Sequence, residues 1–163
     1  MRPGLLALSG GTIAMLLTTR VANAQTATQL VRFQVNAVSQ IGVSGGPVSM
    51  VISSAVAGST PTSVTSSAAT YAITTNELNQ KITASLDQVL PAGVTLEVAL
   101  VAPAGASSAG SVSLNTVGAD VVTGLSRIVG ASLPITYRLT ATPAVQISGP
   151  AARTVTFTIV SGT

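Results

Sequence analysis

The stretch that decides the fold is Thr154-Val155-Thr156-Phe157-Thr158-Ile159, in which hydroxyl and apolar side chains alternate strictly. A period of two is typical of a half-buried β-strand, because successive side chains of a strand point to opposite faces. Residues 135–142 alternate in the same way, with Ile135, Tyr137 and Leu139 on one face. Both stretches predict strands that lay one face on a core.

Shorter alternating runs predict further strands, at residues 48–52, 69–73, 82–86, 94–100 and 121–125. Val and Thr are frequent in these runs, which suits a pleated surface, and Gly, Pro and Asn mark turns between them. No apolar pattern of helical period persists. The sequence therefore predicts an all-β fold, an immunoglobulin-like antiparallel β-sandwich of about 7–9 strands with an N-terminal extension strand. Residues 101–118 and 141–152 are expected to be loops, with a candidate short edge strand at Val112 and Leu114.

The N-terminus has the layout of a secretory signal peptide, with a basic start at Arg2, an apolar stretch at residues 5–17 and a small-residue site at Ala22-Asn23-Ala24. The apolar stretch is shorter than the roughly 20 residues that a membrane-spanning helix needs. We therefore expect cleavage before Gln25, a secreted or cell-surface location, and no stable membrane insertion of the mature chain.

The expected organisation is a cleaved signal peptide at residues 1–24, an N-terminal strand at 25–44 and a β-sandwich domain at 45–163. The N-terminal strand is a candidate donor strand. Its residues 30–38 alternate, and a change of phase at residues 39–43 predicts a bulge or a strand that changes sheets. The apolar side chains expected at an assembly interface are Val31, Phe33, Val35, Val38 and Ile41.

The composition excludes several kinds of chemistry. The chain of 163 residues has no Cys and no His, and only 7% of its residues are charged. Its four acids, Glu77, Asp87, Glu97 and Asp120, are too far apart in sequence for a calcium loop, and the single lysine, Lys81, lies in no catalytic motif. We expect a protein that is not an enzyme, with no catalytic, cofactor-binding or metal-binding residues and no cofactor.

The positive charge gives no reason to expect a nucleic-acid partner. Cleavage would remove Arg2 and Arg20 and lower the net charge from +3 to +1. The remaining cations are scattered, whereas nucleic-acid binding needs a basic stripe, often with stacking aromatic rings. A net charge near zero favours self-association instead.

The few aromatic residues are expected to fill the core rather than to form a sugar-stacking platform. Each of the four falls on the same side of the alternating pattern as neighbouring Ile, Val or Leu residues. The four are Phe33, Tyr71, Tyr137 and Phe157. This leaves no obvious carbohydrate-binding surface.

In its layout the chain resembles the exported β-sandwich subunits of bacterial and archaeal surface fibres, in which an N-terminal strand completes the sheet of the next subunit. The resemblance spans the signal peptide, the alternating residues 30–38, the Thr- and Val-rich sandwich and a final strand at 153–160. Chaperone–usher pilins commonly carry a disulfide and this chain has no Cys, so the resemblance favours fibres that assemble without that machinery, or a surface coat.

The function that we expect is therefore structural: a subunit of an extracellular filament or surface layer, self-associating as a homopolymer by strand donation or edge pairing. Alternatively, residues 30–38 are the first strand of their own sandwich, and sheet edges or flat Thr-rich faces carry assembly. The other function class is a monomeric secreted binding module or adhesin that recognises a glycan or protein receptor through its loops, residues 101–118 in particular.

Overall fold

The structure is a computed structural model of the chain, and it describes residues 25–146 and 149–162. The expected signal peptide, residues 1–24, lies outside them. Contacts divide the chain into two units, Met1–Gln34 and Val35–Thr163. Residues 25–34 of the first unit form neither helix nor strand, and every strand of the described chain belongs to the second unit.

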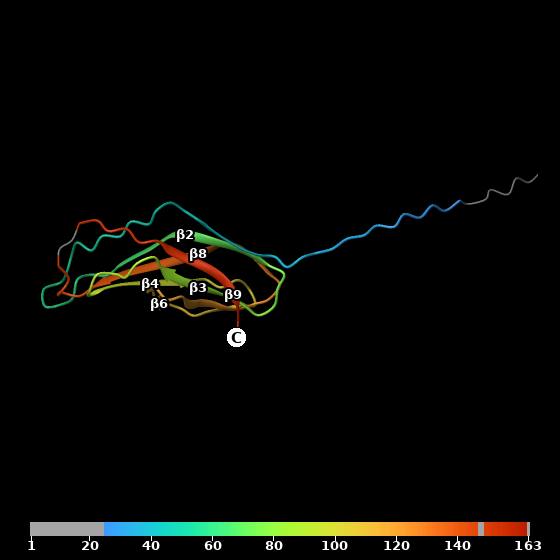
Figure 1. The fold of residues 1–163 in the computed structure, drawn as a ribbon. Helices are drawn as coiled ribbons and strands as arrows, with labels where there is room; N and C mark the ends of the chain where they lie inside the picture. Colours follow the sequence, from blue (N-terminus) through green and yellow to red (C-terminus); the bar gives the residue numbers. More distant parts are fainter. Residues whose placement is uncertain (1–24, 147–148, 163) are drawn as a thin grey trace, which may run out of the picture. The chain divides into compact units, whose positions relative to one another are not determined.

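The second unit is a sandwich of two antiparallel sheets, which confirms the predicted all-β fold (Figure 1). Five strands form one sheet and lie in the order β1 (Ser39–Ser44), β2 (Val64–Thr75), β8 (Ile128–Ala141), β4 (Val94–Leu100) and β6 (Val112–Ser113). Four strands form the other sheet, in the order β5 (Ser107–Ser108), β7 (Ala119–Leu125), β3 (Gln80–Leu86) and β9 (Val155–Ser161).

The core lies between the two sheets and consists of alternate residues from the longer strands. In β3, for example, Ile82, Ala84 and Leu86 are buried, while the residues between them remain partly exposed. Such a strand presents one face to the core and the other to solvent, as its period of two predicts. The largest fully buried side chains are Tyr71, Ile73, Ile82, Leu100, Leu125, Ile135, Val98, Val121 and Val122.

Every predicted strand forms except those at residues 30–38 and 48–52, and β2 and β8 extend several residues beyond their predicted starts. β2 and β8 pair along their lengths, but their register shifts between Ser66 and Ala69 and again between Tyr71 and Ile73. A bulge inserts extra residues on one strand and so breaks the alternation of side chains. The second shift lies beside Ser132, which has a positive φ of 54°. The sequence pattern therefore showed only the regular part of each strand.

The predicted strand at residues 48–52 is wrong, because these residues form no strand. Val48, Met50 and Ile52 are nevertheless half-buried, and the residues between them are exposed. The alternating sequence pattern indicates which side chains face the core. It does not indicate a strand, because a segment can bury alternate side chains without making the hydrogen bonds of a sheet. Pro47, which has no N–H to donate, directly precedes the segment.

The N-terminal strand is shorter than expected. Residues 30–38 form no strand, and β1 begins only at Ser39. Its register against β2 is unbroken, from Ser39 opposite Thr75 to Ser44 opposite Thr70. The prediction of a bulge or a change of sheets at residues 39–43 is therefore wrong, because β1 keeps one register within one sheet.

Three of the four aromatic residues face the core as predicted. Tyr71 and Tyr137 are buried, and Phe157 packs against the core from β9. The prediction is wrong for Phe33, whose side chain is 91% exposed. The Tyr71 hydroxyl donates a hydrogen bond of 2.6 Å to the carbonyl oxygen of Val101, so this buried polar group has a partner.

Candidate assembly surface

The sandwich has two long sheet edges and two short ones. The edge strands β5 and β6 have two residues each, whereas β1 has six and β9 has seven. β1 and β9 belong to different sheets but contact each other, so both long edges lie on the same side of the sandwich. Neither strand contains a charged residue or a proline, the devices that commonly protect an edge from pairing.

The core is incompletely covered at this side. β9 pairs with β3, and its core-facing residues Val155, Phe157 and Ile159 are only half-buried. Their register partners on β3 are at most 4% exposed. In the part of the chain that the structure describes, β9 pairs with β3 alone, so the other side of its backbone has no strand partner. We call the free side of β9, together with these three side chains, the β9 edge.

The apolar residues predicted at the assembly interface fall into two groups. Val31, Phe33 and Val35 belong to no strand, and their side chains are 70%, 91% and 80% exposed. Val38 is 41% exposed, and Ile41 lies in β1, half-buried against the core and opposite Ile73. Ile41 is thus a residue of the sandwich itself, whereas Val31, Phe33 and Val35 show large apolar surface in an alternating stretch.

The polar residue Asn76 binds the backbone where the chain enters β1. The Val38 N–H donates to Asn76 Oδ1 at 2.8 Å, and the Asn76 N–H donates to the Val38 carbonyl oxygen at 3.0 Å. Asn76 Nδ2 also donates to the Asn36 carbonyl oxygen at 2.8 Å. The backbone bond continues the β1–β2 ladder beyond the pair Ser39 and Thr75, and the Asn76 side chain adds two bonds to the backbone of residues 36–38. We call the arrangement of Asn36, Val38 and Asn76 the Asn76 clasp.

From the sequence, Asn residues are expected only to mark turns between strands, so the clasp is not predicted. No local pattern indicates it, because Asn36 and Asn76 are far apart in sequence and meet only through the pairing of β1 with β2. The neighbouring Ser39 hydroxyl bonds Thr75 Oγ1 at 2.8 Å and donates to Glu77 Oε2 at 3.0 Å. Side-chain and backbone hydrogen bonds therefore fix the start of β1 against the end of β2.

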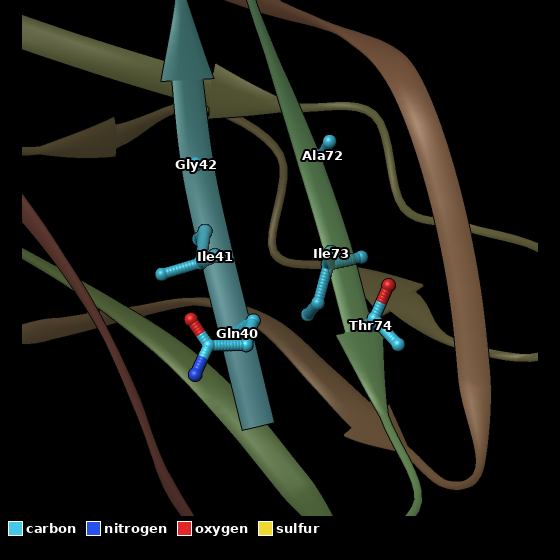
Figure 2. A pocket seen from close by; sticks show the side chains of 6 residues that line it. All are labelled: Gln40, Ile41, Gly42, Ala72, Ile73 and Thr74. Atoms are coloured by element: carbon cyan, nitrogen blue, oxygen red, sulfur yellow. The ribbon is translucent and has the colours of Figure 1, made fainter. Parts of the chain in front are cut away.

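A shallow depression of about 290 Å³ lies over the β1–β2 pair (Figure 2). Its polar side chains come from Gln40 and Thr74, which are register partners, and Gly42 lies opposite Ala72 and leaves the surface low. None of the lining residues is charged. The depression offers neither an ionisable group nor an enclosed apolar cavity, the usual elements of a small-molecule site.

Among the described residues the charged side chains form separate ion pairs rather than one cluster. Lys81 Nζ lies 3.0 Å from Asp120 Oδ2, and Arg138 pairs more loosely with Glu97, at 3.6 Å. Glu97 Oε2 is buried and, among the described residues, accepts no hydrogen bond, so this ion pair is its compensation. Within residues 25–146 and 149–162, no three acidic, Cys or His side chains come together in a way that could hold a metal ion.

Comparisons with known proteins identify no relative. No protein-family model matches the chain, and neither the curated proteins nor the solved structures include a significant match. The class of the protein is therefore defined by its strands alone, which form a two-sheet antiparallel β-sandwich. Among the described residues, no helix is long and apolar enough to cross a membrane.

Proposed function

We propose that this protein is a structural subunit that assembles into an extracellular filament or surface layer. In this proposal, residues 31–35 of one copy add a strand to the β9 edge of another copy. The observation that carries the proposal is the β9 edge itself: a seven-residue, uncharged strand with one free side, above half-buried core residues. Such an edge is an aggregation hazard unless something covers it.

The proposed donor and acceptor match in chemistry. The acceptor lacks apolar cover over Val155, Phe157 and Ile159, and the donor stretch carries Val31, Phe33 and Val35 at the same period of two. Strand addition supplies main-chain hydrogen bonds and places alternate side chains of the added strand against the core. Each buried apolar side chain contributes roughly 1.5–3 kcal/mol before the cost of ordering the donor.

The geometry of donation also supports a polymer. Donor and acceptor are different surfaces of the chain, so each copy that receives a strand still has its own strand to give. Such a head-to-tail contact forms a filament unless a rotation closes it into a ring. The expected homopolymer follows from this asymmetry.

The binding-module alternative has less support. Residues 101–118 contain no charged and no aromatic side chain. Leu114 within them is buried, and Ser108 Oγ donates to the Leu100 carbonyl oxygen at 2.6 Å. This region therefore contributes to the sandwich and offers few of the groups that usually recognise a glycan or a protein.

The test is to express the full chain in a host that exports proteins and to examine the purified protein by negative-stain electron microscopy and light scattering. Regular polymers are expected. They should disappear when Val31, Phe33 and Val35 are all replaced by Ser, because the donor segment then has no apolar side chains to bury in the next copy. The single copy should still fold, since these side chains are exposed in it.

A second pair of variants tests the acceptor. Thr158→Lys places a charge on the β9 edge and should block polymer growth. Thr74→Lys is the matched control, because Thr74 is also an exposed threonine but lies on β2, where it pairs with Gln40 of β1 on one side and with Val129 of β8 on the other. A monomer at every concentration would refute assembly, and polymers that survive both the triple replacement and Thr158→Lys would refute strand donation to β9.

A further inference from the structure

The start of β1 and the end of β9 lie at the same end of the sandwich. Ser39 is the register partner of Thr75, the last residue of β2. Gln80, the first residue of β3, is the register partner of Ser161 at the end of β9. Because only residues 76–79 separate β2 from β3, these two strand ends are close together. Running along the chain, β9 therefore approaches this end and β1 leaves it.

These directions set a condition for pairing within one copy. For residues 31–35 to lie along the β9 edge of their own sandwich, they would have to run toward the shared end and then turn back into β1. The chain would need to reverse direction between Val35 and Ser39. Residues 36–38 would then form a hairpin turn.

The Asn76 clasp opposes that turn. It bonds the Asn36 carbonyl oxygen and both the N–H and the carbonyl oxygen of Val38, the groups that a strand in line with β1 would present to β2. None of residues 36–38 has a positive φ, which the common three-residue hairpin loop needs at one residue. A reversal here would break the hydrogen bonds of the clasp.

We propose that Asn76 is a positioning residue that directs the donor segment to a second copy of the chain rather than to its own β9 edge. This inference rests on the proposed function. Asn76 acts through the backbone of residues 36–38 and takes no part in the contact between copies. The clasp thereby makes the isolated copy unable to cover its own edge, and the uncovered edge remains available for another copy.

Disulfide trapping can test the inference, because the chain has no cysteine of its own. Gln34→Cys marks the donor segment, and Thr156→Cys or Thr158→Cys marks the outward face of β9. Two singly substituted proteins, when mixed, can form a disulfide only between copies. A doubly substituted protein can form it either way, and a non-reducing gel separates a closed monomer from a ladder of multimers.

With Asn76 present, we expect the ladder from the doubly substituted protein and a cross-linked dimer from the mixture. Asn76→Ala removes two side-chain hydrogen bonds, so the ratio of closed monomer to ladder should rise about tenfold. Asn76→Asp retains the acceptor for the Val38 N–H and should fall between the two. Asn115→Ala is the matched control: Asn115 is also exposed and also bonds a backbone N–H, at Val117, and its loss should leave the ratio unchanged.

Three outcomes would overturn the inference. The first is an unchanged ratio in Asn76→Ala when its thermal melt shows that it is folded. The second is a closed monomer that already predominates when Asn76 is present; here the β9 edge still accepts the segment, so only the direction of donation is refuted. The third is no cross-link of either kind, which removes the proposed strand donation and the inference together. If Asn76→Ala does not fold, the ratio of closed monomer to ladder is compared between Asn76→Asp and Asn115→Ala instead. Equal ratios in these two variants would overturn the inference.

Discussion

Replacing Tyr71 with Phe should lower the stability of the sandwich at neutral pH and raise it, relative to the natural chain, at strongly alkaline pH. Tyr71 is 1% exposed, and its hydroxyl donates a hydrogen bond of 2.6 Å to the Val101 carbonyl oxygen. Tyr71→Phe removes that donor from the carbonyl. The free energy of unfolding at neutral pH should fall by about 1 kcal/mol.

The alkaline effect follows from the pKa of the same hydroxyl. Burial raises the pKa of Tyr71 from its ordinary value of 10.0 to about 12. Above about pH 10 the unfolded chain loses this proton while the folded chain keeps it, so the stability of the natural chain falls as pH rises toward 12. The full loss is roughly 2–3 kcal/mol. Since Tyr71→Phe lacks the group, the two stability curves should cross near about pH 11.

Urea unfolding of both proteins, followed by circular dichroism across this pH range, measures the crossing. Burial also raises the pKa of Tyr137, but both proteins contain that residue, so its contribution cancels from the difference. A separate titration of tyrosinate absorbance should show one late-titrating group fewer in Tyr71→Phe. A constant difference in stability at every pH would refute the burial argument for Tyr71.

Three further substitutions test the packing and the surface. Ile82→Ala should cost about 2–5 kcal/mol in guanidinium unfolding, because Ile82 is fully buried between the sheets; a cost under about 1 kcal/mol would contradict its place in the core. Gly93→Ala should lower the melting temperature more than Gly58→Ala. Both glycines have a positive φ, but only at Gly93 would an added Cβ lie 2.5 Å from a threonine hydroxyl. Equal effects of the two substitutions would contradict that contact. Lys81→Ala should cost at most about 1 kcal/mol and less in high salt, because its partner Asp120 is exposed; a cost that salt leaves unchanged would show that another contact is responsible.

The sequence predicted the regular parts of the fold because burial on one face of a strand leaves a local trace. β3 and β4 alternate without interruption, and their predicted and observed bounds nearly coincide. Where the register shifts, as at Ser66 and Ala69 on β2, the local trace is broken and the prediction stops short. Residues 48–52 show the opposite error, since they alternate in burial without a strand partner.

The candidate assembly surface was only half predictable. The apolar side chains of Val31, Phe33 and Val35 are visible in the sequence as an alternating stretch. The free edge is not, because β9 and β3 have equally regular patterns and only the strand order places β9 outermost. Strand order is a property of long-range pairing. The clasp of Asn76 depends on such pairing too, and so no local pattern marked it.

The pairing of β3 with β9 also affects when the sandwich can fold. Gln80 cannot pair with Ser161 until the chain between them has been made. The other long strand pair, β2 with β8, likewise joins segments that are distant in the chain. Sheets dominated by such distant pairings fold slowly, commonly in milliseconds to seconds, because the ends of long loops must first meet. Of the strands that the structure describes, β9 is synthesised last. We therefore expect the sandwich to stay incomplete until β9 has been made, and an incompletely folded chain could pass through a transport channel, which would suit the export that we propose.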